Sequence, residues 1–161
     1  MKVTNFVSPD ANIWKNVKIW HFAYVGSNTT IGDNVKIGSL AHVDYDVKIG
    51  SGTMIEGSVY IPPMSRIGKN VFIGPAAVLT NDPYPPSKKM VGVTIEDEAV
   101  IGARAVLKAG IRVGRRAVVA MGAVVTKDVP PGKVVMGVPA RVVYTREEFD
   151  SKMKAWESSG P

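Results

Sequence analysis

Large aliphatic residues recur at every sixth position through the first half of the chain. From Val7 to Leu79 this register holds without a miss, at positions 7, 13, 19 and onward. A helix repeats near 3.6 residues and a half-buried strand repeats at two, so neither element explains a period of six. The position two residues before each aliphatic is small or β-branched from Ala11 onward. The pattern predicts a unit that places one large side chain in a core and then turns the chain.

A solenoid of short strands satisfies this period. Three units of six residues close one triangular coil, and successive coils stack at the spacing of β-strands, about 4.8 Å. Short repeats of this kind are typical of parallel β-helices. Residues eighteen apart then form columns, and we expect Ile19, Ile37, Ile55 and Ile73 to form one interior column. Gly, Asn and Asp recur near the aliphatic positions, where tight corners favour them.

The register breaks after Leu79 and resumes at Ile95, sixteen residues later. The intervening residues 80–94 contain three prolines, which cannot continue a strand ladder. We expect this stretch to form a loop extruded from the solenoid. The repeat then continues to Val125, which gives about six coils in all. The sequence therefore predicts an all-β fold with one inserted loop.

The C-terminal residues carry a helical pattern. Thr145 and Glu148 make a capping box, and Phe149, Met153 and Trp156 then fall on one apolar stripe. We expect a short helix that covers the open end of the solenoid or docks on a neighbour. The predicted division is a β-helix domain at 1–143, with the loop, and a helix with its tail at 144–161.

Composition narrows the choice of partners. The 161 residues carry a formal net charge of +6 with a pI of about 9.6. The longest basic runs are pairs such as Lys88-Lys89, so small anionic ligands are favoured over nucleic acid. There is no cysteine, which excludes a disulfide framework and a thiol nucleophile. Because no signal-like segment and no run of eighteen apolar residues occurs, we expect a cytoplasmic protein without a membrane partner.

Three stretches carry a family resemblance in addition to the repeat: Ile19-Trp20-His21-Phe22, Thr80-Asn81-Asp82-Pro83-Tyr84-Pro85 and Gly137-Val138-Pro139-Ala140-Arg141. With them, residues from about 7 to 143 resemble the hexapeptide-repeat acyltransferases. Among these, the chain is most similar to acetyltransferases that N-acetylate amino sugars linked to UDP or dTDP, in particular 3-amino sugars. The resemblance implies a left-handed β-helix, acetyl-CoA as the acetyl donor, and a homotrimer whose subunits share each active site.

The resemblance also implies roles for individual residues. In this family acetyl-CoA lies alongside the later coils, and small side chains let it approach the backbone. A guanidinium or an ammonium near the cofactor can bind its phosphates, although both cations can equally be solvated surface charges. The residues expected to bind the cofactor are Gly102, Ala103, Ala120, Lys127, Pro139 and Arg141. Those expected to bind the substrate are Trp20, His21, Tyr45, Asn81 and Tyr84.

The expected chemistry is attack of an amine on a thioester, which does not require a strong base. The enzyme has to position the two groups, stabilise the developing oxyanion and accept a proton. The candidate catalytic residues are Asn81, which can orient the amine, Asp82, which can accept a proton if it points inward, and His21. A surface histidine is the plain alternative for both His21 and His42. No metal is expected, because two histidines in different columns cannot supply the three that a γ-type carbonic anhydrase needs.

Two other functions remain open. An O-acetyltransferase for a hydroxyl acceptor needs a base, normally histidine, and the loop at 80–94 contains none unless His21 or His42 serves from a neighbouring subunit. A non-catalytic β-solenoid scaffold is the alternative from another class, but it requires neither the loop nor the segment 137–141. Glu56 stands where the resemblance predicts Gln-Asn-type residues, and its carboxylate would repel a uronate-bearing substrate.

Overall fold

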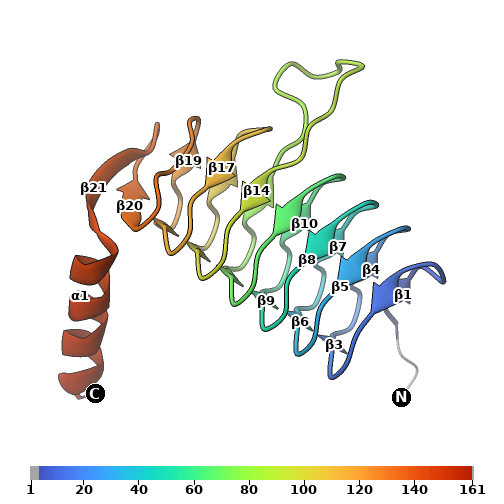
Figure 1. Ribbon diagram of the computed structural model, residues 1–161, viewed down its shortest axis with the longest axis horizontal. Coiled ribbons are helices and arrows are strands. Elements are labelled where there is room, and N and C mark those ends of the chain that lie inside the picture. Colours follow the sequence, from blue (N-terminus) through green and yellow to red (C-terminus); the bar gives the residue numbers. More distant parts are fainter. Residues whose placement is uncertain (1–3, 161) are drawn as a thin grey trace.

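The computed structural model describes residues 4–160 as a parallel β-solenoid followed by one helix (Figure 1). Nineteen two-residue strands, β1 to β19, follow one another along the chain and are interrupted once by a long loop. With β20, they make nearly seven turns, slightly more than the six coils that the repeat predicts. The predicted parallel β-helix is confirmed.

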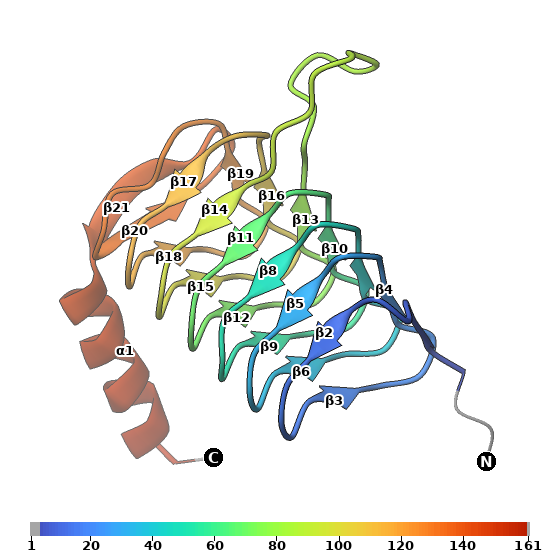
Figure 2. The same cartoon turned by 45° about the vertical axis from the view of Figure 1, so that its right-hand side comes forward.

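The strands form three flat sheets, one on each side of a triangular prism (Figure 2). Sheet A contains β1 (Phe6–Val7), β4 (Tyr24–Val25), β7 (His42–Val43), β10 (Tyr60–Ile61), β13 (Val78–Leu79), β16 (Val106–Leu107) and β19 (Val124–Val125). Sheet B contains β2 (Asn12–Ile13), β5 (Thr30–Ile31), β8 (Lys48–Ile49), β11 (Arg66–Ile67), β14 (Thr94–Ile95) and β17 (Arg112–Val113). Sheet C contains β3 (Lys18–Ile19), β6 (Lys36–Ile37), β9 (Met54–Ile55), β12 (Phe72–Ile73), β15 (Val100–Ile101), β18 (Val118–Val119), β20 (Lys133–Met136) and β21 (Arg141–Thr145).

The predicted interior column is confirmed. Ile19 pairs with Ile37, Ile37 with Ile55 and Ile55 with Ile73, all in parallel register. Past the loop the next partner, Ile101, lies 28 residues on, so the loop adds ten residues to one coil (28 minus 18). The insertion leaves the stacking register unchanged.

The core alternates large and small side chains from successive units. Most of the large aliphatics are fully buried, and the small positions between them are filled by residues such as Ala77 and Val35. Three small positions are polar, Thr29, Thr53 and Ser65, and all three are fully buried. Their hydroxyls donate to backbone carbonyls at 2.8–2.9 Å, which removes the cost of burying an unpaired polar group.

The corners explain why the repeat has six residues. From Ile13 to Val119, the third residue after each interior aliphatic except Leu79 adopts a left-handed conformation, with φ between 52° and 63° at the non-glycine positions. Its amide donates to a carbonyl of the preceding coil, as in Asn34 to Lys15 at 2.9 Å. Asn and Asp tolerate this conformation better than most residues, which accounts for their recurrence. The non-glycine residues that adopt it are Asn16, Phe22, Asn28, Asn34, Leu40, Asp46, Ser58, Met64, Asn70, Ala76, Glu98, Arg104 and Arg116.

The predicted extruded loop projects from the corner between β13 and β14 (Figure 1). It spans 80–93 rather than 80–94, because Thr94 already belongs to β14 and pairs with Arg66. The loop enters and leaves at one corner, so the coils on either side still stack on each other.

The C-terminal end carries a hairpin and a helix. Strand β21 pairs antiparallel with β20, and α1 (Arg146–Ser158) follows with the predicted capping box of Thr145 and Glu148. The expectation that the helix covers the open end is wrong for the single chain, since no residue of α1 is buried and Trp156 is 80% exposed. Instead, Val135 and Ala140 of the hairpin region pack against the core there. No helix in the described part of the chain is long and apolar enough to cross a membrane.

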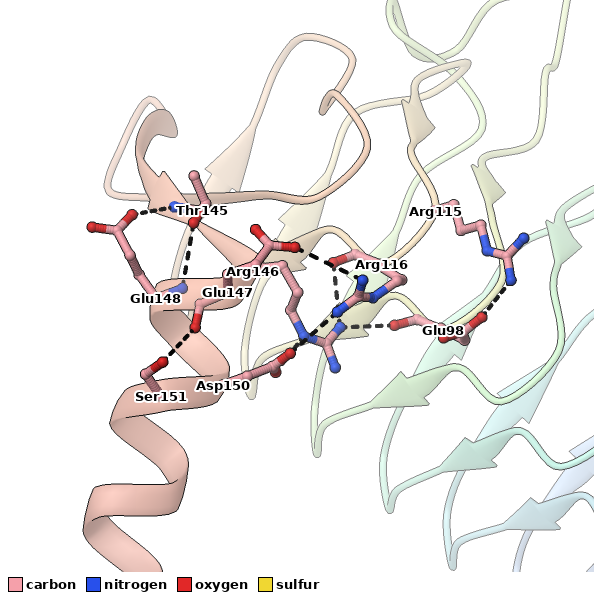
Figure 3. Close-up of polar contacts among 9 residues, drawn as sticks. All are labelled: Glu98, Arg115, Arg116, Thr145, Arg146, Glu147, Glu148, Asp150 and Ser151. Atoms are coloured by element: carbon pink, nitrogen blue, oxygen red, sulfur yellow. Dashed lines mark hydrogen bonds and ion pairs between the residues drawn. The ribbon is translucent and has the colours of Figure 1, made fainter.

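One arginine ties α1 to the solenoid (Figure 3). The guanidinium of Arg146 donates to Asp150 at 2.6 Å and to the backbone carbonyls of Glu98 and Arg116 at 3.0 and 3.2 Å. Arg116 contacts Asp150 at 3.3 Å. The Arg146 hydrogen bond lowers the pKa of Asp150 against the opposing effect of desolvation, and the charge of Arg116 adds to it. The helix is therefore anchored by its first turn and projects beside the prism.

The stacked core predicts the effect of shortening one of its side chains. Ile73→Ala should lower the free energy of unfolding by about 2–5 kcal/mol, because Ile73 is fully buried between Ile55 and Ile101. Urea unfolding followed by circular dichroism measures the change. Lys48→Ala, on the exposed outer face of sheet B, is the matched control and should stay within about 0.5 kcal/mol of the parent. Equal losses for the two variants would contradict the assigned core.

Candidate functional site

Most of the residues expected to bind the cofactor lie along one edge of the prism. We define the C–A edge as the corners that join sheet C strands to sheet A strands: residues 20–23, 38–41, 56–59, 74–77, 102–105 and 120–123. Gly102 and Ala103 follow β15, Ala120 follows β18, and Pro139 follows β20, so the structure brings them to this edge in adjacent coils. A side chain at Gly102 would collide with the backbone amide of Met121. The stack itself therefore requires glycine at 102.

This edge also presents unpaired backbone donors. The amides of Arg104 and Gly122 donate to the preceding coil at 3.0 and 2.8 Å. Within residues 4–160, the backbone amides of Ala103 and Met121 donate to no backbone carbonyl. They stand one coil apart on a surface with small neighbours. Such amides can bind the carbonyl groups of an extended ligand that runs along the edge.

Two cations meet at the C-terminal end of the solenoid. Lys127 and Arg141 line one pocket together with Asp128, Val129 and Ala140. The Arg141 guanidinium donates to the carbonyl of Ala140 at 2.9 Å, and Asp128 accepts from the backbone amide of Arg112 at 2.8 Å. The pocket thus combines two positive side chains, the Asp128 carboxylate and an apolar wall, and the two cations can bind a phosphate-bearing ligand.

A second group of predicted residues lies on the opposite edge of sheet A. This A–B edge comprises residues 26–29, 44–47, 62–65 and the loop 80–93. Tyr45 follows β7 and Asn81 follows β13, with β10 between them in the sheet, so the shared column predicted for this pair is confirmed. The Asn81 side-chain amide contacts the sulfur of Met90 at 3.3 Å, and the Asn81 backbone carbonyl accepts from the backbone amide of Val91 at 2.8 Å. Tyr84, at the loop tip, is 80% exposed.

Asp82 organises the loop. Its carboxylate accepts from the amides of Tyr84 and Ser87 and from the Ser87 hydroxyl, at 2.6–2.9 Å. Desolvation acts to raise the pKa of Asp82, but the hydrogen bonds from Ser87 and Tyr84 together outweigh it and lower that pKa. A carboxylate held in this way is a weak proton acceptor.

The aromatic motif near the N-terminus is remote from the loop. Trp20 and His21 lie on the C–A edge, before β4, and His21 Nδ1 is 3.4 Å from the hydroxyl of Thr4. The full width of sheet A separates these residues from Asn81 and Asp82 on the A–B edge. A single chain therefore does not bring the three candidate catalytic residues together.

The outer face of sheet A carries a column that the sequence reasoning missed. Tyr24 stacks on Phe6 at 5.1 Å and on His42 at 4.5 Å between ring centroids, and Tyr60 is 5.5 Å from His42. His42 Nε2 also lies 3.8 Å from Asp44 Oδ2. Burial and then the charge of Asp44 raise the pKa of Tyr60. The signal was present in the sequence, because these residues stand one before the interior position and recur every eighteen residues.

The three outer faces differ in chemistry. Outward residues of sheet A are aromatic and then aliphatic, ending in Val78, Val106 and Val124. Those of sheet B are polar or charged: Asn12, Thr30, Lys48, Arg66, Thr94 and Arg112. Those of sheet C begin with lysines and turn apolar from Met54: Lys18, Lys36, Met54, Phe72, Val100, Val118 and Val134. The two apolar faces meet at the C–A edge.

Two stretches of the chain match family models of the hexapeptide repeat. Residues 9–44 match the bacterial transferase hexapeptide, and residues 92–127 match the hexapeptide repeat of succinyl-transferase. Both matched stretches lie in the coils of the solenoid, one before the extruded loop and one beginning at its end.

Several proteins similar to this chain are acetyltransferases. The 2,3,4,5-tetrahydropyridine-2,6-dicarboxylate N-acetyltransferase of Staphylococcus aureus is 48% identical over 82 residues, which are 51% of this chain and 34% of that protein. The match thus spans about a third of the relative's length. A hexapeptide-repeat acetyltransferase from Vibrio cholerae, solved with acetyl-CoA, has a TM-score of 0.59 and 27% identity over 75% of this chain and 69% of its own. A maltose O-acetyltransferase from Clostridium difficile has a TM-score of 0.59 and 26% identity over 75% and 68%.

No group of three or more His, Cys, Asp or Glu side chains within residues 4–160 is arranged to hold a metal ion. The candidate site is made of backbone amides, small residues and two cations along the C–A edge and the C-terminal end, with the loop on the A–B edge.

The hydrogen bonds of Asp82 predict how the loop responds to mutation and to acid. Asp82→Asn removes acceptors, so trypsin should cleave after Lys88 or Lys89 faster by on the order of tenfold, because several charge-assisted bonds are lost together.

Since the pKa of Asp82 is lowered by folding, these bonds are complete above its ordinary value of 3.8. They should be lost only as the pH falls through the lower, folded-state pKa. Deuterium exchange of the Ser87 amide against pH measures this.

Asp10→Asn is the matched control for the trypsin experiment, because within residues 4–160 Asp10 accepts from the Ser8 hydroxyl alone, and it belongs to the first coil, far from the loop. It should leave trypsin cleavage unchanged. Cleavage at equal rates in Asp82→Asn and Asp10→Asn would refute the organising role of Asp82.

Proposed function

We propose that the protein transfers the acetyl group of acetyl-CoA to the amino group of a sugar linked to UDP or dTDP, as a homotrimer in the cytoplasm where acetyl-CoA is available. A 3-amino sugar is the preferred acceptor class, on the resemblance of the Trp20 and Asn81 motifs. The observation that carries the proposal is the C–A edge, where small residues and two unpaired amides run toward the pocket of Lys127 and Arg141. The named acetyltransferases among its relatives support the same donor.

The proposed donor site uses few side chains. The pantetheine arm carries amide carbonyls that the backbone amides of Ala103 and Met121 can bind along the edge. Gly102, Ala120 and Pro139 present no bulky group that would block the arm. Lys127 and Arg141 would neutralise the phosphates, and a guanidinium can contact a phosphate through two N–H groups at once.

The proposed reaction is direct acyl transfer. The amine nitrogen attacks the thioester carbonyl carbon, and a backbone amide of the edge stabilises the developing oxyanion. The C–N bond forms, the C–S bond breaks, and coenzyme A leaves as a thiolate with the bonding electron pair. The proton from the amine neutralises that thiolate, directly or through water. Asn81 would orient the amine, His21 would contact the acceptor from a neighbouring copy, and Asp82 would act by ordering the loop.

The trimer is proposed from the faces of the prism. Sheet A and the later part of sheet C expose Val78, Val106, Phe72 and Val100 around the C–A edge, whereas sheet B is polar. This distribution suits a ring in which the apolar sheet A of each copy faces the threefold axis and its C–A edge stands beside the A–B edge of the next copy. Each cleft between copies would then be lined by both chains, which would bring the loop of one toward the C–A edge of another.

A hydroxyl acceptor is the second candidate. His42 faces outward with Nε2 3.8 Å from Asp44 Oδ2, and a histidine is the usual base for a hydroxyl acceptor. The maltose O-acetyltransferase of similar fold is consistent with this alternative.

Thiol release from acetyl-CoA tests the function. The protein should release thiol with at least one member of a panel of UDP- and dTDP-linked 3-amino and 4-amino sugars. Asn81→Ala should lower turnover by on the order of tenfold or more, because the acceptor loses its orienting group, while acetyl-CoA affinity by calorimetry stays the same. Thr126→Ala, at the last A–B corner of the solenoid, is a matched control with full turnover expected.

The panel also includes maltose and the tetrahydropyridine dicarboxylate. Release with maltose alone, abolished by His42→Ala, would replace the proposal with the O-acetyltransferase. Absence of both acetyl-CoA binding and turnover would favour a scaffold.

The trimer proposal predicts the effect of a charge on sheet A. Val106→Asp should convert the trimer to monomers in light scattering at micromolar concentration and abolish acetyl transfer, because a carboxylate would be buried in the contact. Thr30→Asp, which places the same charge on the polar outer face of sheet B, should remain trimeric and active. A monomeric parent protein, or a trimeric Val106→Asp, would overturn the arrangement.

A further inference from the structure

A groove crosses the N-terminal part of sheet C where it meets the C–A edge. It is lined by Trp20, Lys36, Ser39, Met54 and Glu56, with the backbone of Gly38 and Gly57 at its floor. Its volume of about 370 Å³ lies at the lower end of the range for small-molecule sites. It is several coils away from the pocket of Lys127 and Arg141, on the same face as the apolar part of sheet C.

The polar groups of this groove are unpartnered. Within residues 4–160, the Glu56 carboxylate forms no ion pair and accepts no hydrogen bond, and the Lys36 ammonium and Ser39 hydroxyl likewise contact no side chain or carbonyl. This differs from the carboxylates of sheet B and its corners, where Glu96 and Glu98 pair with Arg112 and Arg115 at 2.7 and 2.6 Å. A half-buried carboxylate without a structural partner is available to a ligand.

The floor of the groove is kept open by the backbone. A side chain at Gly38 would stand 2.5 Å from the amide nitrogen of Gly57, and one at Gly57 would stand 3.0 Å from the carbonyl oxygen of Ser39. Glycine at both positions lets adjacent coils approach and leaves no side chain at these two points of the floor. Trp20, 43% exposed, therefore borders an unobstructed surface.

We propose that this groove binds the sugar ring of the acceptor, and that Glu56 restricts the acceptor to amino sugars without a carboxylate. The proposal rests on the function proposed above and names the substrate class within it. The indole of Trp20 offers an apolar face to the C–H groups of a pyranose. The Glu56 carboxylate accepts hydrogen bonds from ring hydroxyls, and such charge-assisted bonds are strong. Lys36 and Ser39 supply donors at the rim.

The selectivity follows from charge. A uronic acid would bring a second carboxylate into a groove whose own carboxylate has no counterion at contact distance. Like charges placed together at a binding site repel each other, so a sugar without a carboxylate is preferred. Lys36 can attract the nucleotide phosphates, but it does not remove the repulsion at Glu56.

The test compares two acceptors on three proteins. The acceptors are a UDP-linked 3-amino-3-deoxyglucose and its uronic acid counterpart, and the proteins are the parent, Glu56→Gln and Glu157→Gln. Glu157 lies on the exposed end of α1, so its variant removes the same charge outside the groove. The parent and Glu157→Gln should prefer the neutral sugar in kcat/KM by on the order of tenfold or more. Glu56→Gln should lose most of that preference through a lower KM for the uronate, with acetyl-CoA affinity unchanged.

A binding measurement separates this inference from the proposed function. Titration of the same two nucleotide sugars should quench tryptophan fluorescence in the parent, and Trp20→Phe should abolish the quench. If acetyl transfer occurs and Glu56→Gln keeps the parent's preference, the inference fails while the function stands. If no acetyl transfer occurs, the titration decides: a quench that depends on Trp20 and favours the neutral sugar upholds the groove, and no quench overturns it. An unchanged thermal midpoint of Glu56→Gln shows that the variant is folded.

Discussion

The structure depends on one backbone contact that is repeated at the corners. The residue in the left-handed conformation donates its amide to the coil before it, for example Leu40 to His21 at 3.3 Å and Arg104 to Pro75 at 3.0 Å. For residues such as Leu40 and Arg104 this conformation costs roughly 1–2 kcal/mol, and it persists because the stacked coils on either side allow no other path. The same contact fixes the unit at six residues, since a longer unit would move both the amide and the interior aliphatic out of register. An insertion is tolerated only where, as at 80–93, it leaves and rejoins the stack at one corner.

Because the register is fixed, outward side chains of successive coils form columns, and these columns determine where functional groups can stand. A strand of two residues has one inward and one outward side chain, so functional groups can stand only on the three outer faces or at the corners. Corners that carry glycine, such as Gly38 and Gly102, bring neighbouring backbones so close that no side chain fits. Backbone amides are then the available donors there. This explains why a ligand site on such a surface is built from small residues along an edge, with charged side chains at the groove of Glu56 and at the terminal pocket of Arg141.

The sequence was sufficient to predict the features that depend on regular spacing. It was insufficient to predict those that depend on contacts between distant segments. The interior column from Ile19 to Ile73, the shared column of Tyr45 and Asn81, and the capping box of α1 all follow from spacing. The place of α1 does not, because Arg146 is held by backbone carbonyls 48 and 30 residues away, which leave no mark in a sequence. The role of Asp82 was missed for a different reason: its partners are only two and five residues away, but the loop that brings them together has no periodic pattern. The aromatic column and Lys36 were readable in principle, by sorting outward positions at a spacing of eighteen.

The rigidity of the prism bears directly on how a reaction site can form. The C–A edge, with Trp20 and the unpaired amide of Ala103, and the A–B edge, with Asn81, are held apart by sheet A and by a packed core that allows no hinge between them. A single chain cannot bring both edges to one substrate. A second copy placed against the apolar outer face of sheet A would oppose the two edges and would also cover Val106 and its neighbours, which are otherwise exposed to water. Completion of the site and burial of the apolar face therefore require the same contact.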